Sequence, residues 1–155
     1  MKGAITSSVW RIQRVLLGAI LWIGICSVTM GVDVAEMTRK AEQGYAIAQY
    51  NLGVMYANGR GVPKDYVEAV KWWSKAAEQG HAAAQYNLGS MYDNGEGVPE
   101  DDAEAYAWWN VAEAGGHKSA QKNRDIIKRN LTPTQLERGQ ALAKEIFERI
   151  QKRNE

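Results

Sequence analysis

The chain has 155 residues, of which 45% are hydrophobic and 24% are charged, and its formal net charge at pH 7 is +1. This composition is typical of one modest folded domain, and it excludes a disordered chain or a two-lobed enzyme. The near balance of charge removes any whole-chain argument for nucleic-acid binding. One cysteine excludes an intramolecular disulfide framework, and two histidines argue against a dedicated zinc site.

The first 31 residues have the organisation of a secretory signal peptide. Three basic residues precede an apolar run over residues 15–25, and smaller residues follow it. We expect cleavage before Val32, which would remove the one cysteine and leave a periplasmic or secreted protein. The alternative is an uncleaved anchor in the inner membrane, because residues 15–32 carry no charge and approach the shortest length that crosses a bilayer.

The body of the chain is an internal repeat. Residues 44–79 and 80–115 align without a gap and are identical at 21 of 36 positions. A third copy starts at Gly116 and diverges after Asn123, and residues 34–43 match only the second half of a unit. A fixed period with degenerate ends is typical of stacked helical units closed by caps. We therefore expect a signal segment (1–31), an N-terminal half-repeat (32–43), two repeats (44–79 and 80–115), a partial repeat (116–130) and a C-terminal capping helix (131–155).

Each full repeat is predicted to fold as two helices. The first carries an apolar stripe that includes Ala48, Leu52 and Met55, and a segment of the form Asn-Gly-x-Gly-Val-Pro ends it. Gly53 and its copy Gly89 lie inside this helix, where glycine costs about 1 kcal/mol relative to alanine. Because both repeats keep this glycine, we expect the backbone of the helix to pack closely against another structural element, with no room for a Cβ.

The second helix of each repeat is predicted to begin at an aspartate cap, Asp65 or Asp101. Two adjacent tryptophans follow in each copy, and adjacent residues point about 100° apart on a helix. We therefore expect one tryptophan of each pair in the core (Trp73 and Trp109) and the other at the seam between repeats, less buried (Trp72 and Trp108).

The C-terminal segment is predicted to be an amphipathic helix that closes the stack. Thr132 can cap it, Pro133 suits the first helical position, and Gln135 completes a capping box. Residues 32–117 hold 6 basic and 13 acidic side chains, whereas residues 118–155 hold 10 and 5. These charges fit solvated faces, and the sharper alternatives are a steering or head-to-tail contact surface or binding to a membrane surface.

The shared pattern A-x-A-Q-Y-N-L-G-x-M-Y-x-N-G-x-G-V-P-x-D-x-x-E-A-x-x-W-W-x-x-A resembles the Sel-one-like repeat, a relative of the tetratricopeptide repeat. The resemblance implies an all-α fold, a right-handed α/α superhelical solenoid whose first helices line a concave face. It also implies a non-catalytic scaffold of the bacterial envelope or secreted fraction that binds a protein or peptide. The alternatives are a peptidoglycan-associated protein and a hydrolase of the cysteine-rich branch, against which the cysteine-free repeats argue.

The helix register of the resemblance places partner-binding residues on the first helix of each unit. Tyr50 and Tyr86 are the best candidates, because tyrosine supplies rigid amphipathic area at a small entropic cost. Asn51, Asn87 and Asn123 recur at one register and are predicted to be structural or to contact the partner only weakly. The predicted concave-face residues are Ile47, Tyr50, Val54, Asn58, Ala83, Tyr86, Ser90, Asp93, Asn94 and Lys122.

No catalytic residue, metal or cofactor is expected. His81 and His117 are equivalent residues of successive repeats, which stack about 10 Å apart, too far to share one zinc ion. We expect both to be exposed near helix starts. The acidic residues 100–102 fit a helix N-terminus better than a calcium loop.

Overall fold

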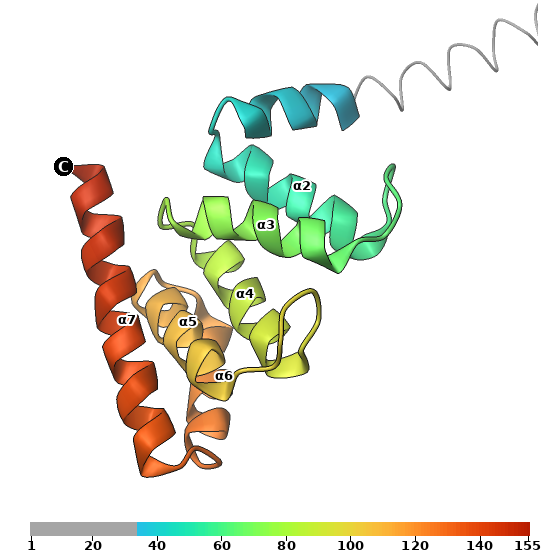
Figure 1. Cartoon of the computed structure of the whole chain (residues 1–155). Helices are drawn as coiled ribbons and strands as arrows, with labels where there is room; N and C mark the ends of the chain where they lie inside the picture. Colours follow the sequence, from blue (N-terminus) through green and yellow to red (C-terminus); the bar gives the residue numbers. More distant parts are fainter. Residues whose placement is uncertain (1–33) are drawn as a thin grey trace, which may run out of the picture. The chain divides into compact units, whose positions relative to one another are not determined.

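Helix is the only regular structure among residues 34–155, the part of the chain that the computed structural model describes (Figure 1). The chain divides into two units, residues 1–36 and 37–155. The predicted signal segment and its cleavage site lie outside the described residues. Of the helices that are described, none is both long and apolar enough to cross a membrane. After helical residues 37–42, the second unit contains α2 (Ala46–Asn58), α3 (Tyr66–Ala77), α4 (Ala82–Asn94), α5 (Asp102–Ala114), α6 (Lys118–Lys128) and α7 (Pro133–Asn154).

Two helical hairpins form the centre of the second unit (Figure 1). Helix α2 packs antiparallel on α3, and α4 packs in the same way on α5. Helix α3 also packs on α4 and α5 on α6, so each repeat is joined to the next through its second helix. The all-α solenoid of helix pairs predicted from the sequence is confirmed.

The predicted helix ends are confirmed. Gly59 and Gly95 end α2 and α4 in the left-handed conformation, each with φ of 66°. The carboxylate of Asp65 accepts hydrogen bonds from the N–H groups of Val67 and Glu68 at the start of α3. Asp101 does the same at the start of α5. These caps satisfy N–H groups that have no partner inside the helix, so they fix where each helix begins.

Each hairpin closes around a tryptophan that lies on a glycine. A Cβ at Gly53 would lie 2.5 Å from Cδ1 and Nε1 of Trp73, and a Cβ at Gly89 would lie 2.5 Å from Nε1 of Trp109. The indole Nε1–H of Trp73 donates to the carbonyl of Tyr50 at 3.1 Å. The prediction that the glycines admit a close neighbour is confirmed, and that neighbour is the partner helix of the same repeat.

The prediction that only one tryptophan of each pair is fully buried is wrong. Trp72 and Trp73 are 6% and 4% exposed, and Trp108 and Trp109 are 6% and 2% exposed. The reason is that α3 and α5 are covered on two sides. Trp73 and Trp109 pack over the glycines, whereas Trp72 packs in another cluster with Leu52 under the Lys75 side chain.

Buried glutamines tie each repeat to the helix before it. Nε2 of Gln49 donates to the carbonyl of Ala41 at 3.0 Å, and Nε2 of Gln85 donates to the carbonyl of Ala77 at 3.1 Å. The Gln49 Oε1 accepts from Gln79, but the buried Oε1 of Gln85 has no partner among the described residues. The difference follows from the sequence, because Gly115 stands where the first repeat has Gln79.

Helix α6 departs from the repeat pattern, because it carries charged residues at two positions where the earlier first helices have none. Arg124 and Asp125 stand where the preceding first helix has Leu88 and Gly89. The Arg124 guanidinium forms ion pairs with Asp125 and with Glu113 of α5. Without the glycine and the leucine, α6 has no apolar surface on which the second helix of a third repeat could pack, so the repeat pattern stops at this helix.

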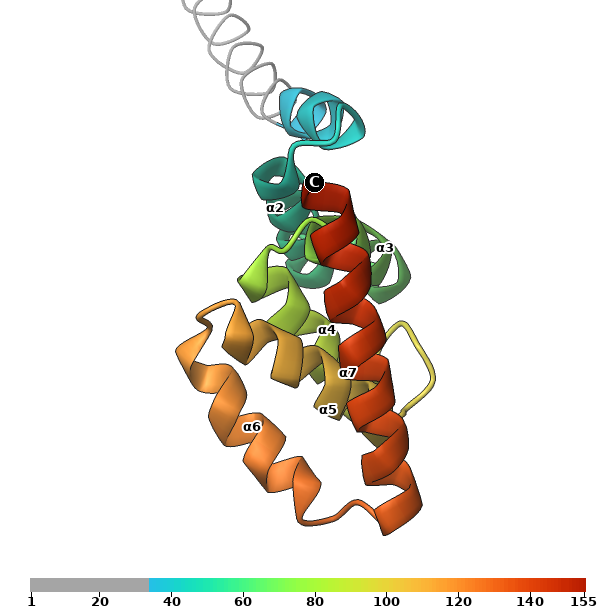
Figure 2. The same ribbon diagram turned by 90° about the vertical axis from the view of Figure 1, so that its left-hand side faces the viewer.

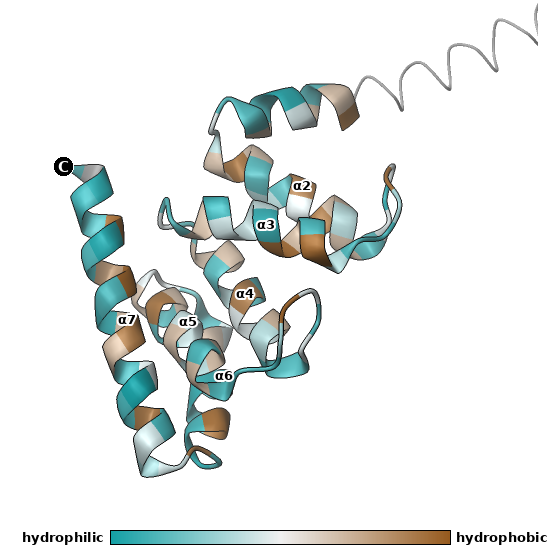
Figure 3. Cartoon of the chain, viewed as in Figure 1, coloured by the Kyte–Doolittle hydropathy of each residue, from teal (hydrophilic) through white to brown (hydrophobic). Residues whose placement is uncertain are grey.

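Helix α7 turns back and packs against α5 (Figure 2). Figure 3 shows its hydrophobic residues on the side facing α5, and Ala143, Ile146 and Ile150 are buried there. The predicted capping box of Thr132 and Gln135 is confirmed at its start.

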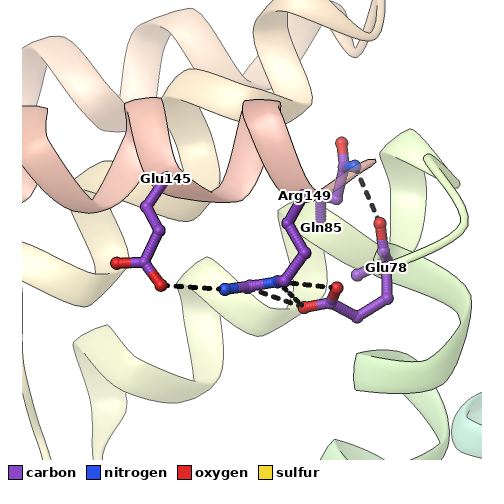
Figure 4. A network of polar contacts seen from close by, with 5 residues as sticks. Glu78, Gln85, Glu145 and Arg149 are labelled. Atoms are coloured by element: carbon purple, nitrogen blue, oxygen red, sulfur yellow. Dashed lines mark hydrogen bonds and ion pairs between the residues drawn. The ribbon is translucent and has the colours of Figure 1, made fainter. Parts of the chain in front are cut away.

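Arginines hold α7 to both repeats. Arg138 donates two hydrogen bonds to the carboxylate of Asp101, at 3.0 and 2.7 Å. Arg149 contacts Glu78 of the first repeat and Glu145 of its own helix (Figure 4). Part of the basic charge at the C-terminal end therefore neutralises acidic groups of the same chain.

Replacement of Gly53 by alanine tests the tryptophan–glycine contact. Alanine is the better helix former, so an isolated helix would gain about 1 kcal/mol. In the folded chain we expect a loss of about 2–4 kcal/mol, because the methyl group displaces the Trp73 indole and its hydrogen bond. Urea unfolding of the wild type and G53A measures the difference. A G53A chain as stable as the wild type would contradict this packing.

Replacement of Gly115 by glutamine should supply the partner that Oε1 of Gln85 lacks. Gly115 has φ of −74°, which glutamine adopts without strain, and the new amide would donate to Gln85 as Gln79 does to Gln49. The control is G115A, which shares the tight contact of a new Cβ with Ala82 but has no amide. We expect G115Q to exceed G115A by about 0.5–1.5 kcal/mol in the free energy of unfolding. Equal stability of the two variants would contradict the role given to the unpartnered oxygen.

Candidate functional site

The predicted partner-binding residues lie on the helices that open each repeat, α2, α4 and α6. They recur at the 36-residue spacing, as in the row formed by Tyr50, Tyr86 and Lys122. Ile126 belongs to the same surface, since it stands at the position of Val54 and Ser90. We call this surface the A-helix face and define it by Ile47, Tyr50, Val54, Ala83, Tyr86, Ser90, Asp93, Lys122 and Ile126.

The predicted residues differ in exposure. Five of them are exposed and five are half-buried. The exposed residues are Ile47, Asn58, Asp93, Asn94 and Lys122, and the half-buried residues are Tyr50, Val54, Ala83, Tyr86 and Ser90. Two large aliphatic side chains on the face are open to water, Ile47 at 69% and Ile126 at 49%. Asn58 serves its own helix, because its Nδ2 donates to the carbonyl of Val54 at 2.8 Å. That these residues contact a partner stays a prediction.

Histidines of the following repeat hold the two tyrosine rings. Tyr50 stacks on His81 with ring centroids 4.6 Å apart, and Tyr86 stacks on His117 at 4.2 Å. Both histidines lie at helix starts as predicted, but they are half-buried and not exposed, because the tyrosines cover them. Burial lowers the pKa of the His81 imidazole. Sequence reasoning missed this stacking, although the tyrosine and the histidine recur together at the repeat spacing.

The backbone and hydroxyl of the tyrosines are also fixed. The carbonyls of Tyr50 and Tyr86 accept the indole N–H groups of Trp73 and Trp109, each at 3.1 Å. The hydroxyl of Tyr86 accepts a hydrogen bond from Nδ2 of Asn123 at 3.2 Å, which agrees with a structural role for this asparagine. Contacts within and between repeats thus set the positions of the aromatic rings on the A-helix face.

A hollow of about 240 Å³ lies between α4, α5 and α6. Partial burial raises the pKa of its Asp93 carboxyl, and the carboxylates of Asp102 and Glu100 raise that pKa further. Sequence reasoning named Asp93 but not the hollow. The signal that could have found it was a difference between the repeats, since Ala57 and Tyr66 stand where the second repeat has Asp93 and Asp102. The lining residues are Asp93, Asp102, Trp109, Asn123, Ile126, Ile127 and Asn130.

Another hollow, of about 580 Å³, lies beside the start of α2. The exposed side chains of Tyr45 and Ile47 contribute to its lining. It extends the A-helix face towards the helical residues that precede α2. Its remaining lining residues are Met37, Arg39, Lys40, Gln43, Ala48 and Asn51.

The acidic residues at the start of α5 act on that helix. Burial alone would raise the pKa of Asp101, but hydrogen bonds from Arg138 and from the backbone N–H of Glu104 outweigh it and lower the pKa. Asp101 is therefore an ionised cap and ion-pair partner. Over residues 34–155, no group of three or more histidine, cysteine, aspartate or glutamate side chains could hold a metal ion.

Comparison with known proteins assigns the repeat. The model of the Sel1 repeat family matches residues 46–81 and 82–117. The matched segments begin two residues later than the repeats defined from the sequence, at the first residues of α2 and α4. None of the curated proteins matches the chain.

Two solved structures resemble this chain. One is the crystal structure of a protective antigen present in uropathogenic Escherichia coli strains, which displays an SLR fold. Its sequence is 37% identical to this chain and its TM-score is 0.73. The match covers 76% of this chain and 25% of the antigen. A Sel1 repeat protein from Oxalobacter formigenes is 39% identical with a TM-score of 0.60, and the match covers 61% of this chain and 39% of that protein. This chain thus spans well under half of either relative. The sequence pattern, the helix pairs and these neighbours agree that residues 46–117 consist of two Sel1 repeats.

Proposed function

We propose that this chain is a non-catalytic scaffold that binds a protein or peptide partner on its A-helix face. Sel1 repeat proteins are generally protein-interaction scaffolds. The observation that carries the proposal for this surface is the combination of two exposed isoleucines, Ile47 and Ile126, with two tyrosines held by neighbouring residues.

This combination suits binding for two physical reasons. Exposed aliphatic side chains gain free energy when a partner removes them from water. Tyrosines that are already stacked lose little conformational freedom on binding, so less of the contact energy is spent on ordering them. The tyrosine rings are stacked on histidines, and the backbone carbonyls beneath them are bonded to indoles.

The proposed place of action is the periplasm or the secreted fraction of a bacterial cell. The support is the sequence of residues 1–31, which has the basic start, apolar run and small-residue exit of a signal peptide. The alternative is attachment to the inner membrane through residues 15–32.

Mass spectrometry of the protein purified from the cells that make it decides between these locations. We expect a mature chain that begins at Val32 and lies in the soluble part of the envelope fraction, because the predicted peptidase site precedes that residue. An intact chain that sediments with membranes would contradict cleavage and favour the anchor.

Replacement of the exposed isoleucines tests the binding face. The double variant I47S/I126S introduces the residue that already stands at equivalent positions, Ser119 and Ser90. Capture from an envelope extract with the full chain as bait, quantified by mass spectrometry, should recover the specific partner about tenfold less with this variant, a loss of about 1.4 kcal/mol.

The matched control is V67S, which truncates an aliphatic side chain that is 63% exposed on α3, outside the A-helix face. We expect V67S to recover the partner as the wild type does, and all three proteins to unfold at similar temperatures. A partner lost with V67S and retained by I47S/I126S would place the binding surface elsewhere.

A further inference from the structure

The hollow between α4, α5 and α6 holds negative charge that the fold leaves unneutralised. Asp93 and Asp102 line it, and none of its lining residues is basic. Neither carboxylate forms an ion pair or accepts a hydrogen bond within residues 34–155. By contrast, the neighbouring Asp101 is paired with Arg138. The two lining carboxylates are therefore free to bind a ligand.

The repeat fold does not require these two carboxylates. At the equivalent junction between the first two repeats, Ala57 and Tyr66 occupy their positions. The frame around them is the same at both junctions, because a tryptophan and two asparagines recur there (Trp73, Asn87 and Asn94 against Trp109, Asn123 and Asn130). The acidic pair is thus an addition to a shared frame at one junction only.

The position of Asp93 is unfavourable for stability. It lies in the last turn of α4, where the carbonyl end of the helix repels negative charge and no basic residue compensates it. Partial burial, followed by Asp102 and Glu100, raises the pKa of its carboxyl. A group whose pKa is raised by folding destabilises the native state while it is ionised, at pH values above that pKa. While it is ionised, Asp93 therefore opposes folding where it stands.

We propose that this hollow receives a lysine or arginine side chain of the partner segment that docks on the A-helix face. Two carboxylates and the amide oxygens of Asn123 and Asn130 can accept hydrogen bonds from the cationic group. Trp109 and Ile127 offer an apolar wall for its methylene stem. The inference rests on the proposed function, since it assumes that the partner lies on this face.

The surroundings of the hollow further define the partner segment. Ile126 lines the hollow and is 49% exposed, so an apolar residue beside the cation would cover it. Lys122 lies one turn earlier on α6 and repels a second positive charge. The recognised feature is one basic residue next to an apolar residue, and not a run of basic residues.

Selection of a phage-displayed library of random short peptides on the full chain tests this inference. We expect the selected peptides to share a lysine or arginine beside an aliphatic or aromatic residue. Their affinity for D93N/D102N should fall at least about tenfold relative to the wild type. The control E137Q/E148Q makes the same change in net charge at two residues of α7, away from the hollow, and should bind within about twofold of the wild type.

Thermal unfolding separates loss of binding from loss of structure. Because Asp93 opposes folding, D93N should raise the unfolding temperature by roughly 1–5 °C at neutral pH, and the gain should shrink in acid, where the wild-type carboxyl is protonated. A less stable D93N would overturn the inference that Asp93 opposes folding and is kept for binding.

The remaining outcomes distinguish the two proposals. Selected peptides without basic residues, or with unchanged affinity for D93N/D102N, would overturn the cation pocket. If I47S/I126S still weakened those peptides, the A-helix face would stand as the docking surface. Peptides that bind all of these variants equally would overturn both the pocket and the face.

Discussion

The contact between an indole and a helix glycine organises both repeats of this chain. Trp73 packs on Gly53 and Trp109 packs on Gly89 so closely that there is no room for a Cβ at either glycine. The same indole N–H groups bond the carbonyls of Tyr50 and Tyr86. One contact therefore packs the hairpin and fixes the backbone that carries the half-buried tyrosines of the A-helix face. The histidine of the following repeat then fixes each ring.

The C-terminal end of the stack is closed by departures from the repeat pattern. Arg124 and Asp125 replace the leucine and glycine that would seat another hairpin. Helix α7 packs on α5 instead, and its arginines reach Asp101 and Glu78 of the second and first repeats. Part of the basic excess at the C-terminal end therefore has a structural role, since Arg138 and Arg149 fasten the last helix to acidic residues of the repeats.

The sequence was sufficient for features that depend on neighbours in the chain. The aspartate caps, the left-handed glycines and the capping box of α7 are set within a few residues, and each was predicted. The tight glycines were also predictable, because a glycine inside a helix is costly unless a close neighbour needs the space of its missing side chain. The burial of Trp72 was not, since a helical wheel does not show that a second neighbour covers α3. The tyrosine–histidine stacks and the acidic hollow join side chains from different helices and repeats, and only the fold brings them together.

The central claim is that the A-helix face is where this chain meets its partner, and photo-crosslinking tests it most directly. A photoreactive benzophenone amino acid would replace Ile47, Ile126 or Val67 in turn, all three of which are exposed. Irradiation in the cells that make the protein should attach the same partner to the chain from residues 47 and 126 and not from residue 67. Crosslinks from residue 67 alone, or equally from all three, would contradict the claim.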